Sequence, residues 1–366
     1  MKKRLYPLFL LISCLALLFC LALLFNSALT AFGGNKALSG EVVAVQQDPA
    51  ALVLQTNDGK RIAVLLEEDT YISGMDGIDG EAYKAAPHAG VSVYFFPEGR
   101  GTSLPAEDGE TLKAYHADSF IGIDSYLVEN AAALSDGTAL DAWKNSGRRT
   151  RYQLKDGTEL LREDAPSGPE NHYVGSLESF DDLSESAKPA VRQHYAEQGQ
   201  LYDLPYELER AYAEYLADPE GFSSHWVSQD VSPTGSSSRV MYFQTNLILP
   251  TGGNTIEETH LLAAFDRETG AYIPTASLFS CPGPEIGKRL LDLAEKDGWP
   301  DTPALKQEML AAFRLEYVTI SSHGLYISYP QGTLPSQEYG YGLSVDYDDG
   351  LRAILHPWAV PDASGA

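Results

Sequence analysis

An apolar run from Leu5 to Phe25 follows three cations near the start of the sequence, Lys2, Lys3 and Arg4. The run carries no charge and matches the roughly 20 residues that a helix needs to cross a bilayer, whereas the apolar core of a cleaved signal has about 7–15. Cations favour the cytoplasmic side of the membrane. We therefore predict a signal anchor in residues 1–34, which makes this a single-pass cell-membrane protein with its C-terminal part extracytoplasmic.

Two other fates of this leader stay open. Residues Asn26 to Ala31 are small and polar, as a cleavage site requires, although Leu29 fits poorly where a small residue is preferred. Cleavage there would make the protein secreted. Leu11 to Cys14 is similar to a bacterial lipobox, but the apolar run continues well beyond Cys14. We favour the anchor over cleavage and treat lipidation of Cys14 as the minority alternative.

Acidic residues dominate the charge of the chain. It has 51 Asp and Glu against 26 Lys and Arg, which gives a formal net charge of −25 at pH 7. Such a charge repels nucleic acid and attracts cationic partners at low salt, and it also serves plain solubility. We therefore predict no nucleic-acid partner and consider a cationic envelope or host protein. Cys281 is the only cysteine beyond the leader, so the exported part has no internal disulfide.

Short strand patterns separated by turn residues fill residues 38–128. Asn57 to Lys60 is a strong tight-turn signal, and the five strand candidates are 40–45, 51–56, 61–66, 90–96 and 113–121. Five short strands fit a small antiparallel β-barrel. The pattern also resembles the small β-barrel domains of bacterial secreted proteins, in which a G-x-V-x-x-V strand, an Asp-Gly-Lys turn and a G-V-x-V strand recur.

Residues 134–219 combine two turn-centred repeats with two helical patterns. Leu134–Thr138 and Leu154–Thr158 share the sequence L-x-D-G-T, and each is flanked by strand-like residues. Residues 187–198 and 204–216 then show helical periodicity. We predict hairpins followed by two amphipathic helices, as part of the C-terminal domain or packed on it.

Residues 222–360 alternate between strand and helix patterns. A strand pattern ends at Asp266, and Glu268-Thr269-Gly270 turns the chain back. Helix patterns begin at Pro284 and at Thr302-Pro303. The strand candidates of this segment are 239–250, 260–266, 317–320, 324–329 and 342–347. This order predicts an α+β domain with helices packed on an antiparallel sheet.

The stretch from Gln244 to Ala359 resembles the extracytoplasmic domain shared by the lysozyme-responsive anti-sigma-V factor and the non-catalytic region of a peptidoglycan polysaccharide deacetylase. In that family a strand ending F-D-x-x-T-G leads into an L-x-x-L-F loop, a helix and two further strands. The matching residues are Phe265, Asp266, Thr269, Gly270, Leu278, Phe279, Gly324, Leu325, Tyr329, Val345 and Tyr347. Where family members commonly have G-G-A-H, this chain keeps the two glycines and continues with Asn254-Thr255.

Together these patterns predict an α+β fold class. It comprises a small N-terminal antiparallel β-barrel and a C-terminal antiparallel sheet with packed helices, preceded by one transmembrane helix.

The sequence shows no motif for catalysis. It lacks G-x-S-x-G and H-E-x-x-H, and its eight histidines have no metal-ligand spacing. Glu258 and His260 would share one face of a strand, which suits a two-ligand metal site but more often marks a solvated face. Residues 346–350 are rich in oxygen atoms, yet they lack the ligand order of a calcium loop, and Asp349-Gly350 alone explains a turn. We predict no catalytic residues, no metal site and no cofactor.

Tyrosines supply the candidate binding surface. The chain has 21 of them, and tyrosine provides rigid amphipathic contact area but also favours strands. The candidates are Tyr326, Tyr329, Tyr339, Tyr341 and Tyr347. We predict a non-enzymatic, membrane-anchored envelope protein that binds or senses a partner, such as the cationic protein lysozyme. An enzyme that acts on cell-wall polymer and a passive spacer are the alternatives.

Overall fold

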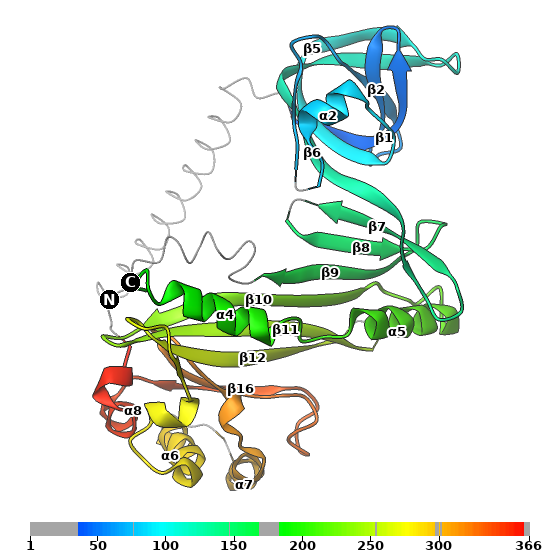
Figure 1. Cartoon of the computed structure of the whole chain (residues 1–366). Coiled ribbons are helices and arrows are strands. Elements are labelled where there is room, and N and C mark those ends of the chain that lie inside the picture. The colour runs from blue at the N-terminus through cyan, green and yellow to red at the C-terminus, as the bar shows by residue number, and fades with distance from the viewer. Residues whose placement is uncertain are drawn as a thin grey trace, which may run out of the picture. The chain divides into compact units, whose positions relative to one another are not determined.

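The structure, a computed structural model, describes residues 36–75, 77–145, 147–167, 183–252, 255–296, 300 and 302–361. The chain forms two compact units. Unit 1 comprises the residues up to Val128 together with Trp143–Gly147, and unit 2 comprises Glu129–Ala142 and the residues from Arg148 on. Figure 1 labels their helices and strands.

In its described residues, unit 1 is built from strands of very different lengths and one short helix. The elements are β1 (Leu38–Gln47), β2 (Ala50–Gln55), β3 (Arg61–Leu65), β4 (Tyr71–Ser73), α2 (Gly80–Ala85), β5 (Val91–Pro105) and most of β6 (Thr111–Ala133). β1, β2 and β3 pair antiparallel in succession, and β5 pairs antiparallel with both β1 and β6. β3 and β4 pair with β6 in parallel. Alternate apolar residues of these strands, such as Leu52, Phe95 and Ile121, are fully buried in its core.

The predicted fold class is wrong. Thirteen strands of the described residues are hydrogen-bonded into one mixed sheet, in the order β13-β12-β11-β10-β9-β8-β7-β6-β3-β2-β1-β5, with β4 beside β6. A separate antiparallel barrel in residues 38–128 is therefore not present. The reason lies in β6, of which the predicted strand at 113–121 is only a part. β6 continues for 23 residues, because irregularities in its pairing with β5 are absorbed as bulges rather than as a turn.

The central part of unit 2 consists of sheet strands and two helices. The elements are β7 (Ala139–Asn145, which ends in unit 1), β8 (Arg149–Gln153), β9 (Glu159–Ser167), α4 (Lys188–Gln198), α5 (Leu204–Ala217), β10 (His225–Ser236), β11 (Val240–Gly252) and β12 (Thr255–Asp266). β9 runs parallel to β10, whereas β10, β11 and β12 are antiparallel neighbours. The predicted antiparallel C-terminal sheet is thus a mixed sheet.

Helices α4 and α5 lie along one side of this sheet, which we call the helix face (Figure 1). On α4, Val191 and Tyr195 pack against Phe243 of β11 and Phe265 of β12, all at most 6% exposed. α5 begins where Asp203 accepts a hydrogen bond from the Tyr206 backbone N–H, followed by proline in the first turn. Both helices lie where the sequence pattern predicts them. We call the other side of β10–β12 the ladder face, after a row of polar side chains on it that is described below.

The turn after β12 explains the F-D-x-x-T-G pattern. The Asp266 carboxylate accepts hydrogen bonds from the backbone N–H groups of Glu268 and Thr269 and from the Thr269 hydroxyl. Gly270 has a φ of +70°, and a Cβ there would lie 2.3 Å from the backbone oxygen of Ala187. Glycine is therefore required both by the turn and by the close approach of the segment that leads into α4.

The C-terminal part of unit 2 packs on the ladder face at the Val240 end of β11. It comprises β13 (Tyr272–Ile273), η2 (Thr275–Leu278), α6 (Gly283–Lys296), α7 (Pro303–Ala312), η3 (Leu315–Tyr317), β14 (Val318–Ile320), β15 (Gly324–Tyr329), β16 (Tyr341–Asp346), α8 (Asp349–Ile354) and η4 (Pro357–Ala359). β14, β15 and β16 form a separate three-stranded antiparallel sheet. Val240 and Tyr242 share a core with α6, α7 and these strands.

The predicted span from Leu5 to Phe25 lies outside the described residues. Within the part of the chain that is described, the structure has no helix of the length and apolarity that a membrane crossing requires.

Candidate functional site

The five candidate tyrosines do not form one surface. Tyr329 is fully buried and its hydroxyl donates to the Met309 backbone oxygen at 3.1 Å. Tyr347 is half-buried and donates to the Ser321 backbone oxygen at 2.9 Å. Burial raises the pKa of both hydroxyls. Tyr341 lies opposite Tyr329 across the β15–β16 pair and contacts the C-terminal core. These three tyrosines support the fold.

Tyr326 and Tyr339 remain exposed, at 38% and 65% respectively. The ring of Tyr326 covers Gly342 on the neighbouring strand, where a Cβ would come within 2.3 Å of its Cζ. Side chains alternate between the two faces along a strand, so Tyr326 and Tyr329, which are three residues apart, lie on opposite faces. The sequence therefore already held the signal that these two side chains diverge.

A row of polar side chains crosses the ladder face of unit 2, and we call it the polar ladder. It consists of Asp230 on β10, Gln244 and Asn246 on β11, and Glu258 and His260 on β12. Asp230, Asn246 and His260 stand directly opposite one another in the strand register. Each is half-buried, and no sequence pattern pointed to the row as a whole. Register between distant strands brings these side chains together.

Hydrogen bonds orient the side chains of the polar ladder. The Asn246 amide nitrogen donates to Asp230 Oδ2 at 3.1 Å, so its carbonyl oxygen is left as an acceptor. Gln244 Nε2 donates to that oxygen at 2.5 Å, and His260 Nδ1 lies 3.0 Å from it. His260 Nδ1 also lies 3.0 Å from Gln244 Nε2. The Nδ1 atom thus either donates to Asn246 or accepts from Gln244, and in a neutral imidazole this choice decides which of the two ring nitrogens carries the proton.

Burial is the main influence on Asp230. It raises the pKa of this carboxyl above its ordinary value of 3.8, while the hydrogen bond from Asn246 acts in the opposite direction. The Glu258 carboxylate adds to the rise in pKa, and His260 opposes it. The polar ladder therefore offers hydrogen-bond donors and acceptors beside two carboxyl groups, those of Asp230 and Glu258.

The predicted juxtaposition of Glu258 and His260 is present. His260 Nε2 lies 3.9 Å from Glu258 Oε1, and the His260 side chain is 19% exposed. Among the described residues, no group of three His, Cys, Asp or Glu side chains has a geometry that could hold a metal ion. In the same residues His260 has no hydrogen bond to a hydroxyl or thiol, so the arrangement supplies an imidazole without an adjacent nucleophile.

A buried carboxylate on the helix face is satisfied by tyrosines. Glu163 is 7% exposed and accepts hydrogen bonds from Tyr202 at 2.7 Å and from Tyr152 at 3.2 Å. Burial, together with this carboxylate, raises the pKa of both tyrosine hydroxyls. No sequence signal pointed to the group, because its three members come from β8, β9 and the segment that leads into α5. The two hydrogen bonds to Glu163 link β8, β9 and the segment before α5 to one another.

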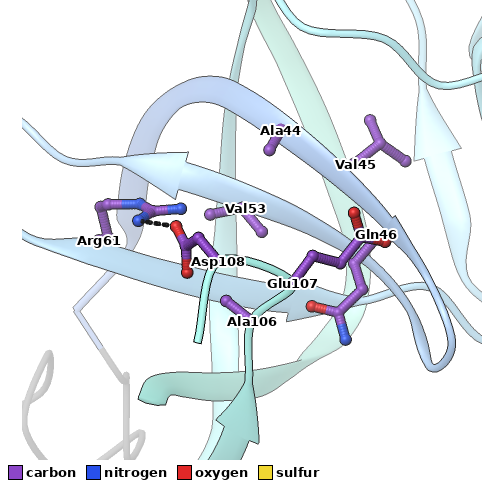
Figure 2. A pocket seen from close by; sticks show the side chains of 8 residues that line it. All are labelled: Ala44, Val45, Gln46, Val53, Arg61, Ala106, Glu107 and Asp108. Atoms are coloured by element: carbon purple, nitrogen blue, oxygen red, sulfur yellow. Dashed lines mark hydrogen bonds and ion pairs between the residues drawn. The ribbon is translucent and has the colours of Figure 1, made fainter. Parts of the chain in front are cut away.

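Unit 1 contains a pocket of about 210 Å³ beside the tip of the β5–β6 hairpin (Figure 2). Its lining residues are Ala44, Val45, Gln46, Val53, Arg61, Ala106, Glu107 and Asp108. Figure 2 shows Arg61 directed at Asp108, with a hydrogen bond of 2.6 Å that lowers the pKa of Asp108. Arg61 also contacts Glu110 at 2.6 Å. Because two carboxylates already neutralise this cation, the pocket offers an anion no charged contact.

Gln46 forms a wall of the same pocket. It is 5% exposed, and its amide nitrogen donates to the backbone oxygens of Asp48 and Pro105. The amide oxygen is buried and has no hydrogen-bond partner among the residues that the structure describes. The amide orientation is fixed by its two bonds, so Gln46 joins β1 to the end of β5 as a structural contact.

Comparisons with known proteins find likeness only at the level of structure. No protein family profile matches the chain, and no curated protein matches it. A DUF3298 family protein from Pseudomonas aeruginosa matches with a TM-score of 0.31 and 13% identity, covering 65% of this chain and 94% of that chain. A member of the same family from Bacteroides fragilis matches with a TM-score of 0.34 and 14% identity, covering 64% and 92%. Neither is named as an anti-sigma factor or a deacetylase.

Proposed function

We propose that this chain is a membrane-anchored, extracytoplasmic envelope protein that binds a cationic protein and catalyses no reaction. The supporting observation concerns the ion pairs that the Lys and Arg side chains of unit 2 form. Most of them already form ion pairs within the fold: Arg149–Asp164, Lys155–Asp141, Lys188–Glu185, Arg210–Glu207, Arg239–Asp266, Lys288–Asp292, Arg289–Glu285 and Lys306–Glu295. The acidic excess of the chain is therefore left on the surface, where it attracts a basic partner.

We also propose that residues 222–360 correspond to the extracytoplasmic domain shared by the anti-sigma-V factor and the deacetylase. Support comes from the order of the sequence motifs and from the single turn into which Asp266, Thr269 and Gly270 fold. That family resemblance makes lysozyme, a strongly basic protein, the first partner to test. The exposed tyrosines Tyr326 and Tyr339 supply amphipathic contact area in the same unit.

The test measures binding of the purified full chain to hen lysozyme by interferometry, in about 20 mM and about 150 mM salt. We expect saturable binding that weakens as salt rises, and that is lost with lysozyme whose lysines have been succinylated. Charge inversion of the partner is the matched control, because it keeps the protein's size. No saturable binding at low salt, or equal binding of both lysozymes, would contradict the proposal and favour the spacer or enzyme alternatives.

A further inference from the structure

Strand β12 has an open outer edge. Along its inner side it pairs with β11 from Thr255 to Asp266. Along its outer side β13 pairs only with Ala264 and Phe265, and no other strand among the described residues pairs with it. In the described part of the chain the backbone groups before Leu262 on that side thus pair with no strand, and unpaired edge groups of this kind can accept another strand.

Two backbone hydrogen bonds show which backbone groups point outward. The Arg267 N–H donates to Arg239, on the β11 side, whereas the Asp266 N–H donates to Ala271, on the β13 side. Because directions alternate along an antiparallel strand, Ile256, Glu258 and His260 direct their N–H and C=O groups to the outer edge. Ile256 is 47% exposed and Glu258 is exposed as well, so the edge is accessible. Leu262, further on, already packs against the C-terminal core.

The charge beside this edge selects the kind of strand that could join it. Glu257 and Glu258 are consecutive, so they flank the edge on both faces of the sheet. A second copy of this chain paired edge to edge would bring these glutamates toward their own counterparts, and like charges across a strand pair are destabilising. A segment with two consecutive basic residues would instead neutralise one glutamate on each face.

The polar ladder ends at the same edge. Asp230, Asn246 and His260 are aligned across β10, β11 and β12, so a strand added beside β12 would continue the row on the ladder face. We propose that this edge binds an extended segment of the cationic partner by strand addition, with two consecutive Lys or Arg residues opposite Glu257 and Glu258. The proposal rests on the proposed function and specifies how its partner is held.

The probe is a fluorescein-labelled peptide of sequence Thr-Val-Thr-Lys-Arg-Thr-Val-Thr, and its binding to the purified full chain is measured by fluorescence anisotropy. Amide hydrogen exchange supplies the second readout. We expect exchange at Ile256, Glu258 and His260 to slow by about tenfold or more when peptide is bound, because these N–H groups become hydrogen-bonded. Peptide binding without slower exchange at these three residues would overturn strand addition.

Glu258→Pro is the decisive variant. It removes an outward N–H but none of the bonds to β11, and proline is accepted on an edge strand. We expect about a tenfold loss of peptide affinity, with the thermal unfolding of the variant close to that of the wild type. The matched control, Glu258→Gln, removes the charge but keeps the N–H, so its loss should be smaller and should vanish at high salt. If Glu258→Pro and the wild type bind the peptide with equal affinity, strand addition at this edge is wrong.

Lysozyme binding separates the two proposals. If lysozyme binds wild type and Glu258→Pro equally well, the proposed function stands and strand addition is wrong for that partner. If lysozyme binds neither protein, the proposed function fails, and the peptide measurements alone decide whether the edge accepts a basic strand.

Discussion

The helix face and the polar ladder come from the same three strands, β10, β11 and β12, yet they are held by different forces. On the helix face, Val231, Phe243 and Phe265 are nearly or fully buried against α4. In the polar ladder, Asp230 and Gln244 are half-buried, and each forms a hydrogen bond with Asn246. Burial of large apolar side chains stabilises the helix face. The hydrogen bonds of the polar ladder compete with water and contribute less, while Val240 and Tyr242, further along the ladder face, are buried in the C-terminal core.

The largest expected effect tests this division directly. Phe243→Ala removes a fully buried ring that contacts Tyr195 and Phe265, and it should lower the free energy of unfolding by about 3–5 kcal/mol. Gln244→Ala, one residue along, is the matched control and should cost about 1 kcal/mol or less. Urea denaturation followed by circular dichroism measures both. Similar losses for the two variants would contradict the distinction between the faces.

A smaller effect is expected where the α4 segment approaches the turn after β12. Gly270→Ala should destabilise unit 2 by about 1–3 kcal/mol, because φ is +70° and the new Cβ meets the Ala187 oxygen at 2.3 Å. Gly332 provides the control, since its φ is +81° and a Cβ there would meet nothing within 4 Å. The difference between the melting temperatures of the two variants isolates the close approach. If Gly332→Ala is as harmful, backbone conformation alone accounts for the glycine.

The smallest effect concerns the pH dependence of the ladder face. Burial raises the pKa of Asp230 in the folded state, so the folded protein holds this proton more tightly than the unfolded chain does. The contribution of Asp230 to stability is therefore greatest below the ordinary pKa of 3.8, and it falls as pH rises through the folded-state pKa.

Melting temperatures of wild type and Asp230→Asn, compared from pH 4 to pH 7, check this sign. The wild type should lose stability relative to the variant as pH rises, and Asp230→Ala should behave like Asp230→Asn because it is also uncharged. A gap that stays constant, or that changes in the opposite direction, would rule out a raised pKa at this position.

Local patterns in the sequence predicted many elements but not their assembly. The helices at 188–198 and 204–217, the turn at Asp266–Gly270 and the strand at 324–329 follow from periodicity and turn chemistry. The barrel was a wrong prediction because β6 continues past the expected strand and pairs with β3 in parallel. Partner choice of this kind depends on contacts between residues far apart in the chain, which no short window contains.

The candidate site shows the same limit. Strand parity places Tyr326 and Tyr329 on opposite faces, and it also places Glu258 and His260 on one face, so both relations were within reach of the sequence. The link from His260 to Asp230 was not, because it needs the registers of two strand pairs at once.

The sequence by itself determined which residues alternate, where turns form and how acidic the chain is, because these depend on neighbouring residues and composition. The tertiary structure decided which strands meet, which tyrosines are buried, and that the polar ladder ends at the open edge of β12, because strand register and packing are set by contacts that form only when distant segments fold together.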